Sequence, residues 1–137
     1  MKRWIHSSED NLLKLINKLP SVPGERGLCV NPIPEAPQEL QSAIEAERAG
    51  ADIYYFSKRF PNWQMVDLSS LTTKQNFLNR AYLKELAAVP ELDDKGLVVL
   101  KYKDNHMIAD GNHRLALDYL RGVPERRVNV VDVEDLH

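Results

Sequence analysis

The chain has 137 residues, a formal net charge of −2 and a sequence pI of about 6.1. A chain of this length can bury one hydrophobic core, and its composition is that of a globular protein. The slight acidic excess argues against a protein that coats DNA through bulk charge, because such proteins carry a clear basic surplus.

Cysteine content and hydropathy narrow the class further. Cys29 is the only cysteine, so the sequence excludes an internal disulfide and a cysteine metal cluster. No apolar run reaches the length of a membrane span, and the first residues lack the apolar segment of a signal peptide. We therefore expect a cytoplasmic protein that does not associate with a membrane.

The first part of the chain, residues 1–62, is expected to be a helical N-terminal extension that packs on the remainder. Apolar residues at helical spacing stop near Pro20, and five prolines then mark an irregular segment. The expected elements are a helix over 12–19, a strand over 28–30, a helix over 37–49, and residues 53–56 as either a helix or a strand.

The second part, residues 63–137, alternates strand-like and helix-like patterns. Thr72 and Gln75 have the spacing of a capping box, and Gly122 has the position of a left-handed helix terminator. The order predicts an α+β fold, a small mixed sheet with packed helices. The expected elements are strands over 65–68, 97–102, 106–109 and 128–133, helices over 73–88 and 112–121, and a turn at 104–105.

The run from Asp110 to Ala116, DGNHRLA, is the most informative motif of the chain. It follows a predicted strand and opens a predicted helix, which places His113 and Arg114 in the first helical turn. The first N–H groups of a helix lack internal partners and carry partial positive charge, so they bind phosphate well. Gly111 allows a ligand to approach the backbone closely, and an arginine can grip a phosphate through two hydrogen bonds. The motif therefore predicts a phosphate site.

The same segment resembles the ParB/sulfiredoxin superfamily. The hairpin, the DGNHRLA helix start, the exit at residues 122–124 and the final valine-rich strand carry the resemblance, together with residues 66–75. It covers about residues 63–133 and implies a ParB/sulfiredoxin-like fold with a nucleotide phosphate at the motif helix. The nucleotide-binding residues that it implies are Gly111, Asn112, His113 and Arg114, with Thr72, Thr73 and Lys74 from a facing helix start.

Departures from the superfamily patterns narrow the expected chemistry. Asn112 stands where sulfiredoxins have their cysteine, which argues against that reaction. The Glu-Arg-Arg of the ParB box is absent at the motif, and the one at residues 125–127 follows the helix and does not substitute for it. We expect no helix-turn-helix segment after it, which argues against a chromosome-partition protein. DGNHR is most similar to the DGHHR motif of the free-serine kinases, which transfer phosphate from ADP or ATP.

We therefore expect a protein that binds a nucleotide such as ATP or ADP and transfers or hydrolyses its phosphate. Arg114 would neutralise charge on the phosphoryl group, His113 would orient it, and Asp110 would hold Mg²⁺ or act as a base. One alternative is a DNA or RNA nuclease, with His106, Asp110 and His113 around a metal. Another is a non-catalytic module that binds a protein partner through residues 1–62.

Each candidate also has a purely structural interpretation. Arg114 could pair with Asp110 or Asp118, Lys74 could be a solvated surface lysine, and Thr73 a plain helix cap. Cys29 is expected to be a small buried hydrophobe. The aromatic residues Trp4, Tyr54, Tyr55, Phe56 and Trp63 are expected in the core, with base stacking as the alternative.

Overall fold

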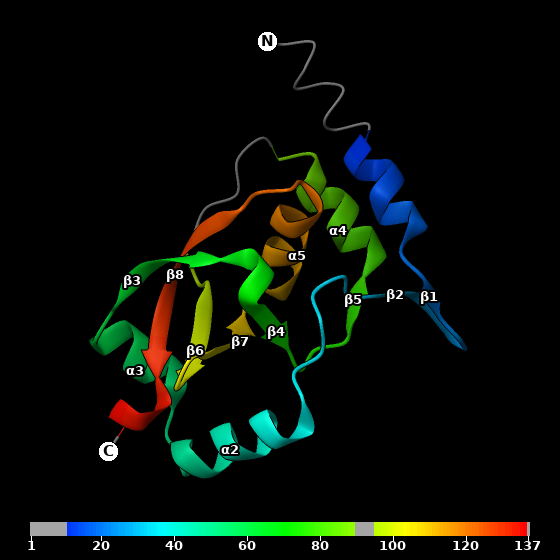
Figure 1. Ribbon diagram of the computed structural model, residues 1–137. Coiled ribbons are helices and arrows are strands. Elements are labelled where there is room, and N and C mark those ends of the chain that lie inside the picture. Colours follow the sequence, from blue (N-terminus) through cyan, green and yellow to red (C-terminus); the bar gives the residue numbers. More distant parts are fainter. Residues whose placement is uncertain (1–10, 90–94, 137) are drawn as a thin grey trace.

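The computed structural model describes residues 11–89 and 95–136, which form an α+β fold with five helices and two sheets (Figure 1). The five-stranded sheet has the order β3-β8-β6-β7-β4, with parallel pairs β8/β6 and β7/β4 and antiparallel pairs elsewhere. Its strands are β3 (Trp63–Asp67), β4 (Leu71–Thr73), β6 (Val98–Tyr102), β7 (Asn105–Asp110) and β8 (Glu125–Asp132).

A small antiparallel sheet and the helices complete the fold. The small sheet joins β1 (Ser21–Val22), β2 (Glu25–Val30) and β5 (Phe77–Asn79). The helices cover residues 11–18, α2 (Gln38–Arg48), α3 (Ile53–Arg59), α4 (Arg80–Ala87) and α5 (Asn112–Leu120), with short 3₁₀ turns at η1 (Leu68–Ser70) and η2 (Val133–Asp135). Among the described residues, no helix is long and apolar enough to cross a membrane.

Both faces of the large sheet are buried, which explains the continuous apolar run in β6. Successive side chains of a strand point to opposite faces. Val99 therefore joins a core cluster with α4, α5 and the helix over 11–18, whereas Val98 and Leu100 join a second cluster with α2 and α3. The sheet thus lies between two helical layers (Figure 1).

Residues before Trp63 contribute directly to this core. Ile16 and Cys29 are fully buried in the same cluster as Leu115 of α5. β2 pairs with β5 through Leu28–Asn79, Cys29–Leu78 and Val30–Phe77, and Arg80 donates to the carbonyl oxygen of Leu19 over 2.8 Å. The burial of Cys29 confirms its expected role and raises the pKa of its thiol.

The predicted helix over 73–88 begins too early, and this is the main error in the expected elements. Residues 71–73 form β4, residues 77–79 form β5, and the helix begins only at Arg80. The cap is Asn79, whose side chain accepts the Tyr82 N–H, so the Thr72–Gln75 capping box does not form. Thr72 instead donates to the carbonyl oxygen of His106 on the neighbouring strand, over 2.9 Å.

Most other expected elements are confirmed, with shifted boundaries. Residues 53–56 belong to α3, which Asp52 caps by accepting the Tyr55 N–H. The hairpin turn lies at residues 103–104 instead of 104–105, because Tyr102 pairs with Asn105 and Lys103 adopts a φ of 55°. α5 ends as predicted before Gly122, whose φ is 78°.

The aromatic residues were assigned to the core incorrectly in three cases. Tyr54, Tyr55 and Trp63 are 50%, 65% and 38% exposed. Phe56 is partly buried against the second core cluster, and Trp4 lies outside the described residues. The exposed set lies on α3 and the edge strand β3, so it is available to contact a ligand.

Candidate functional site

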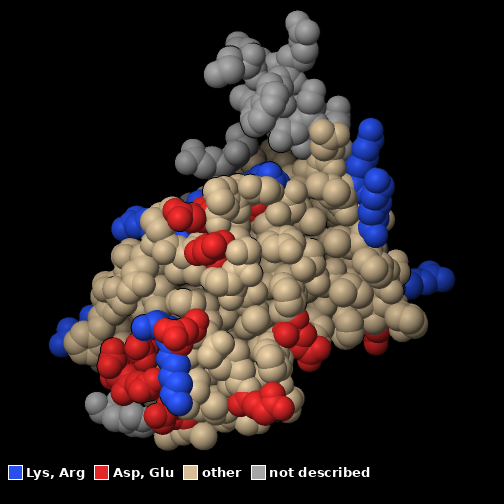
Figure 2. All heavy atoms as spheres, viewed as in Figure 1, with Lys and Arg blue, Asp and Glu red and all other residues tan. Residues whose placement is uncertain are grey.

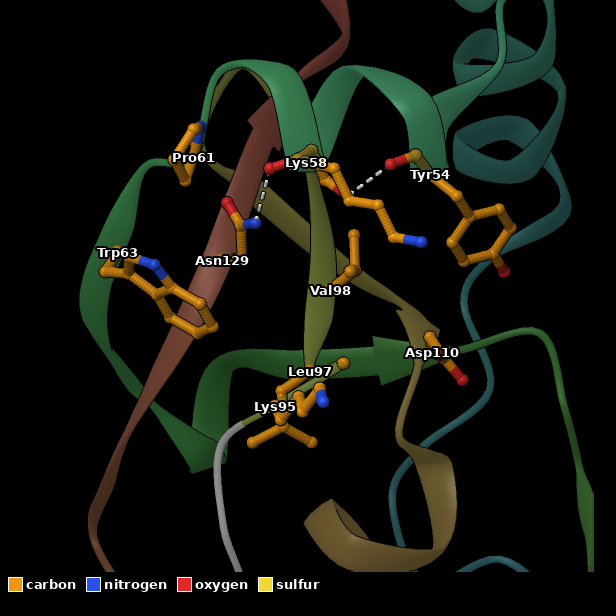
Figure 3. A pocket seen from close by; sticks show the side chains of 11 residues that line it. Tyr54, Lys58, Pro61, Trp63, Lys95, Leu97, Val98, Asp110 and Asn129 are labelled. Carbon is orange, nitrogen blue, oxygen red and sulfur yellow. Dashed lines mark hydrogen bonds between the residues drawn. The ribbon is translucent and has the colours of Figure 1, made fainter.

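Two adjoining pockets open around Asp110, at the end of β7 and the start of α5. The smaller has a volume of about 180 Å³ and is lined by Gln75, Tyr82 and residues 109–114. The larger, about 580 Å³, lies between α3, the start of β3 and the beginning of β6 (Figure 3). Asp110 lines both pockets, so the strand-to-helix junction of the motif separates them.

A β-bulge at the end of β7 positions the motif. Val98 pairs with Asp110 but Val99 pairs with Ile108, so Ala109 is the extra residue of the bulge. The Tyr54 hydroxyl donates to the Ala109 carbonyl oxygen over 3.1 Å, which ties α3 to this strand end. Bulges next to functional sites redirect the side chains that follow them.

Gly111 is required here for packing as well as for backbone conformation. Its φ is 88°, and a Cβ at this position would lie 2.3 Å from Leu97 Cδ2. The space that a side chain would take is therefore filled by a fully buried leucine, while Gly111 also lines the smaller pocket. The Gly111 N–H donates to Asp110 Oδ1 over 2.9 Å, which fixes the carboxylate beside the helix start.

Arg114 turns back toward the beginning of β6. Its Nη1 donates to the Lys95 carbonyl oxygen. A methyl group on Gly96 would lie 3.3 Å from Arg114 Nη2 and 3.7 Å from Asp110 Oδ2. The guanidinium and the carboxylate therefore both pack against Gly96, which lines the larger pocket.

His113 is held in its neutral form by a backbone contact. Its Nε2 accepts the Asn79 N–H over 2.9 Å, and its ring meets Tyr82 edge to face with centroids 4.9 Å apart. Burial lowers the pKa of His113, because the imidazolium loses solvation. With Nε2 as the acceptor, the ring proton lies on Nδ1.

This contact makes stability depend on pH in a defined direction. In the unfolded chain His113 titrates near 6.5, but its native pKa is lower, so protons bind the unfolded state first as the pH falls. The stabilisation is complete above 6.5 and decreases below it. We expect the urea-derived free energy of unfolding to decrease between pH 7 and pH 5, and the His113→Gln variant to show a smaller decrease.

His106 also contributes to the pH dependence of the free energy of unfolding, in the wild type and in the variant alike. Burial is the main cause that lowers the pKa of His106, so this residue contributes a slope of the same sign in both proteins. Glutamine at 113 offers an acceptor oxygen to Asn79 but does not titrate. Equal pH slopes for the wild type and His113→Gln would contradict the assignment.

The predicted residues Thr73 and Asn112 meet in a buried network. Thr73 is fully buried, and its Oγ1 donates to Asn112 Oδ1 over 2.6 Å and accepts the Gln75 N–H over 3.0 Å. Asn112 Nδ2 donates to Gln75 Oε1 over 3.4 Å. These side chains connect β4 to the start of α5, so Thr73 is a connector between elements instead of a helix cap.

Lys74 lies apart from the motif pocket. Its Nζ is 3.8 Å from Glu45 Oε1 on α2, with both side chains about half exposed, and it lines a different surface hollow with α2. The structure therefore does not bring Lys74 to the residues of the motif. The weak ion pair fits the surface-lysine interpretation.

Asp118, in the C-terminal half of α5, forms ion pairs with two arginines. Its carboxylate lies 3.1 Å from Arg126 Nε and 3.7 Å from Arg121 Nη1. Burial raises the pKa of Asp118, and the two arginines counteract that rise. This cluster anchors the C-terminal turn of α5 to β8.

The metal arrangement of His106, Asp110 and His113, which was the alternative for a nuclease, does not form. Within residues 11–89 and 95–136, no three His, Cys, Asp or Glu side chains are grouped to hold a metal ion. The Asp110 carboxylate can serve as one ligand of a Mg²⁺ ion when phosphate oxygens supply further ligands.

Sequence reasoning missed the larger pocket. Its lining comes from four separate segments, among them Tyr54 and Lys58 of α3, Trp63 of β3 and Gly96 before β6. The only signal was the group of aromatic residues between 54 and 63. These aromatic residues lie next to polar residues of α3 and at the start of β3, and that pattern could have indicated that their side chains are exposed.

Comparisons with known proteins add no assignment for this chain. No family model, no curated protein and no solved structure matches it.

Proposed function

We propose that the chain binds a nucleoside di- or triphosphate such as ATP or ADP at the smaller pocket and transfers or hydrolyses its phosphate. The observation that carries the proposal is the convergence of Asp110, Gly111, His113 and Arg114 on one pocket at the start of the nine-residue helix α5. N–H groups at a helix start and an arginine suit phosphate. The resemblance of this motif to the ParB/sulfiredoxin superfamily supports the same function and the corresponding fold.

Each residue then has a role. Arg114 neutralises charge that develops on the phosphoryl group, and the helix start adds to this effect. His113 donates from Nδ1 to a phosphate oxygen, because its Nε2 already accepts the Asn79 N–H. Asp110 would hold a Mg²⁺ ion that the nucleotide brings, and the ion would supply further charge neutralisation.

Surface charge favours a nucleotide over a nucleic-acid strand. On the face in Figure 2, basic side chains lie mainly along the margin, and the densest group of acidic ones, with one basic side chain among them, lies near the C-terminal end, where η2 carries Glu134 and Asp135. Long phosphate backbones are bound by continuous basic surfaces. The net charge of −2 likewise favours the nucleotide enzyme over a DNA or RNA nuclease, and a module that binds proteins through residues 1–62 stays a second alternative.

Removal of Arg114 should abolish nucleotide binding. A nucleotide at about 100 times its Kd stabilises the native state by about 2.7 kcal/mol, which raises Tm by about 9 °C for a chain of this size. We expect that rise for the wild type with ATP, ADP, CTP or GTP and Mg²⁺ in a thermal-shift assay, and none for Arg114→Ala.

Arg121→Ala is the matched control. Arg121 lies at the other end of α5 and donates to a backbone carbonyl, that of Val89, as Arg114 does to Lys95. This variant should keep the ligand-induced rise even if its own Tm is lower. A full rise in Arg114→Ala would overturn the proposal, and Mg²⁺-dependent cleavage of DNA or RNA that requires His113 would support the nuclease instead.

A further inference from the structure

The larger pocket has the size and lining of a small-molecule site. Its volume of about 580 Å³ lies in the range of roughly 300–1,000 Å³ that such sites occupy. Leu97, Val98 and Pro61 supply apolar surface, and Trp63 adds an aromatic ring. In Figure 3, Trp63 and Asp110 stand at opposite ends of the pocket, so a ligand between them would meet an indole at one end and a carboxylate at the other.

The wall of this pocket is fixed by internal hydrogen bonds. Asn129 is buried, donates to the Ser57 carbonyl oxygen over 2.9 Å and accepts the Asn62 N–H over 2.9 Å. Ser57 Oγ donates to the Tyr54 carbonyl oxygen over 2.9 Å. These groups hold α3 against β8, so the pocket is preformed and its polar wall groups are already satisfied.

Trp63 is placed to stack on a planar group. The Arg127 guanidinium lies 5.0 Å from the centroid of the indole, and Arg127 is not part of the pocket lining. The ring is thus supported from outside the pocket while the residue remains 38% exposed. An indole held in this way offers a stacking surface of the kind that binds nucleobases.

Three charged residues also line the pocket: Lys58, Lys95 and Asp110. The Lys58 side chain extends from α3 across the pocket, away from Trp63 and toward the side of Tyr54 and Asp110 (Figure 3). Its ammonium can donate to the oxygen atoms of a sugar at that end. Asp110 can accept from hydroxyl groups of a sugar, and the same residue borders the pocket at the start of α5.

From this arrangement we propose that the larger pocket binds the nucleoside of the nucleotide, with the base stacked on Trp63 and the sugar beside Asp110. One ligand then spans both pockets, with its phosphates at Arg114 and its base at Trp63. The inference rests on the proposed function for its phosphate end only, since the nucleoside end depends on separate residues.

The test separates the two ends of the ligand. In a Trp4→Phe background, Trp63 is the only tryptophan, so its fluorescence reports on the larger pocket. Titrations use the four ribonucleosides, their triphosphates and inorganic tripolyphosphate. We expect one triphosphate to quench Trp63. By calorimetry, Trp63→Leu should bind that triphosphate at least 10-fold more weakly, with unchanged tripolyphosphate affinity, and Trp63→Phe should lie between.

Two variants serve as controls. Tyr55→Leu removes an aromatic residue of α3 that is 65% exposed and not part of the lining, and it should leave both affinities unchanged. Arg114→Ala should show the opposite pattern of affinities to Trp63→Leu. It should no longer bind tripolyphosphate, whereas the nucleoside should still bind weakly and quench Trp63.

The outcomes distinguish the two proposals. If tripolyphosphate binds but Trp63→Leu leaves triphosphate affinity unchanged, the nucleoside pocket is overturned and the phosphate site stands. If tripolyphosphate does not bind but a nucleoside quenches Trp63, the phosphate site falls and the nucleoside pocket stands. No quenching by any nucleoside or triphosphate overturns the pocket, as does an equal loss of both ligands in Trp63→Leu.

Discussion

Gly111→Ala should destabilise the protein by about 2–5 kcal/mol. A non-glycine residue with left-handed backbone angles costs about 1–2 kcal/mol, and Gly111 has a φ of 88°. The added Cβ would also lie 2.3 Å from Leu97 Cδ2, and forcing extra atoms into a packed core costs about 1–3 kcal/mol more. Urea unfolding followed by circular dichroism measures the sum.

Gly122→Ala isolates the backbone contribution. Gly122 has a φ of 78°, but a Cβ added there would meet no atom within 4 Å, so only about 1–2 kcal/mol should be lost. In Gly111→Ala combined with Leu97→Ala, the clash is absent, and the two single losses should not add. Equal losses at Gly111 and Gly122 would contradict the packing role of Leu97.

Thr73→Val should cost about 2–3 kcal/mol, because it removes a fully buried hydroxyl with two partners. Asn112 Oδ1 loses its donor at 2.6 Å, and the Gln75 N–H loses its acceptor at 3.0 Å. Valine has nearly the shape of threonine, so the loss reports on hydrogen bonds instead of on cavity formation. The same urea experiment gives the value.

Thr72→Val is the neighbouring control. Its hydroxyl makes one bond, to the His106 carbonyl oxygen, at a half-buried position, so about 1 kcal/mol should be lost. With Asn112→Ala as background, Thr73→Val should cost clearly less than in the wild type, which gives a coupling of about 1–2 kcal/mol. Additive losses would show that Thr73 and Asn112 act independently.

These two predictions concern the same structural question, namely what holds the start of α5 in place. Leu97 packs against Gly111 on one side of the helix start. On the other side, the hydrogen bond between Thr73 and Asn112 links the helix start to β4. A phosphate-binding helix start needs such support, because its N–H groups must be aimed before the ligand arrives. Weak support would appear as reduced ligand affinity in variants that still fold.

The contacts that support the start of α5 also show which site residues mainly stabilise the fold. His113 Nε2 and the Asn112 side chain bond to β5 and β4, whereas Asp110 and Arg114 line the pocket and bond to backbone groups beside it, the Gly111 N–H and the Lys95 carbonyl oxygen. The order of mutational effects on nucleotide binding should follow this division. Changes at Arg114 and Asp110 act on the ligand directly, whereas changes at Asn112 lower the free energy of unfolding and reduce ligand affinity only through the support of the helix start.

The features that depend on neighbouring residues could be predicted from the sequence alone. The end of α5 at Gly122 follows from a left-handed glycine, and β3, β6, β7 and β8 follow from their apolar runs. The position of the DGNHR motif between a strand and a helix also followed from the sequence, because each signal lies within a few residues of the element that it specifies.

The features that depend on distant partners could not be predicted, because they are set by tertiary contacts. Thr72 and Thr73 became a strand because β7 offered a parallel edge more than 30 residues away, which outweighed a local capping pattern. The partners of His113, Arg114 and Asp118 were decided in the same way. The larger pocket arises where α3, β3, β6 and β7 meet, and no local pattern encodes such a meeting, because its geometry is set by packing between segments.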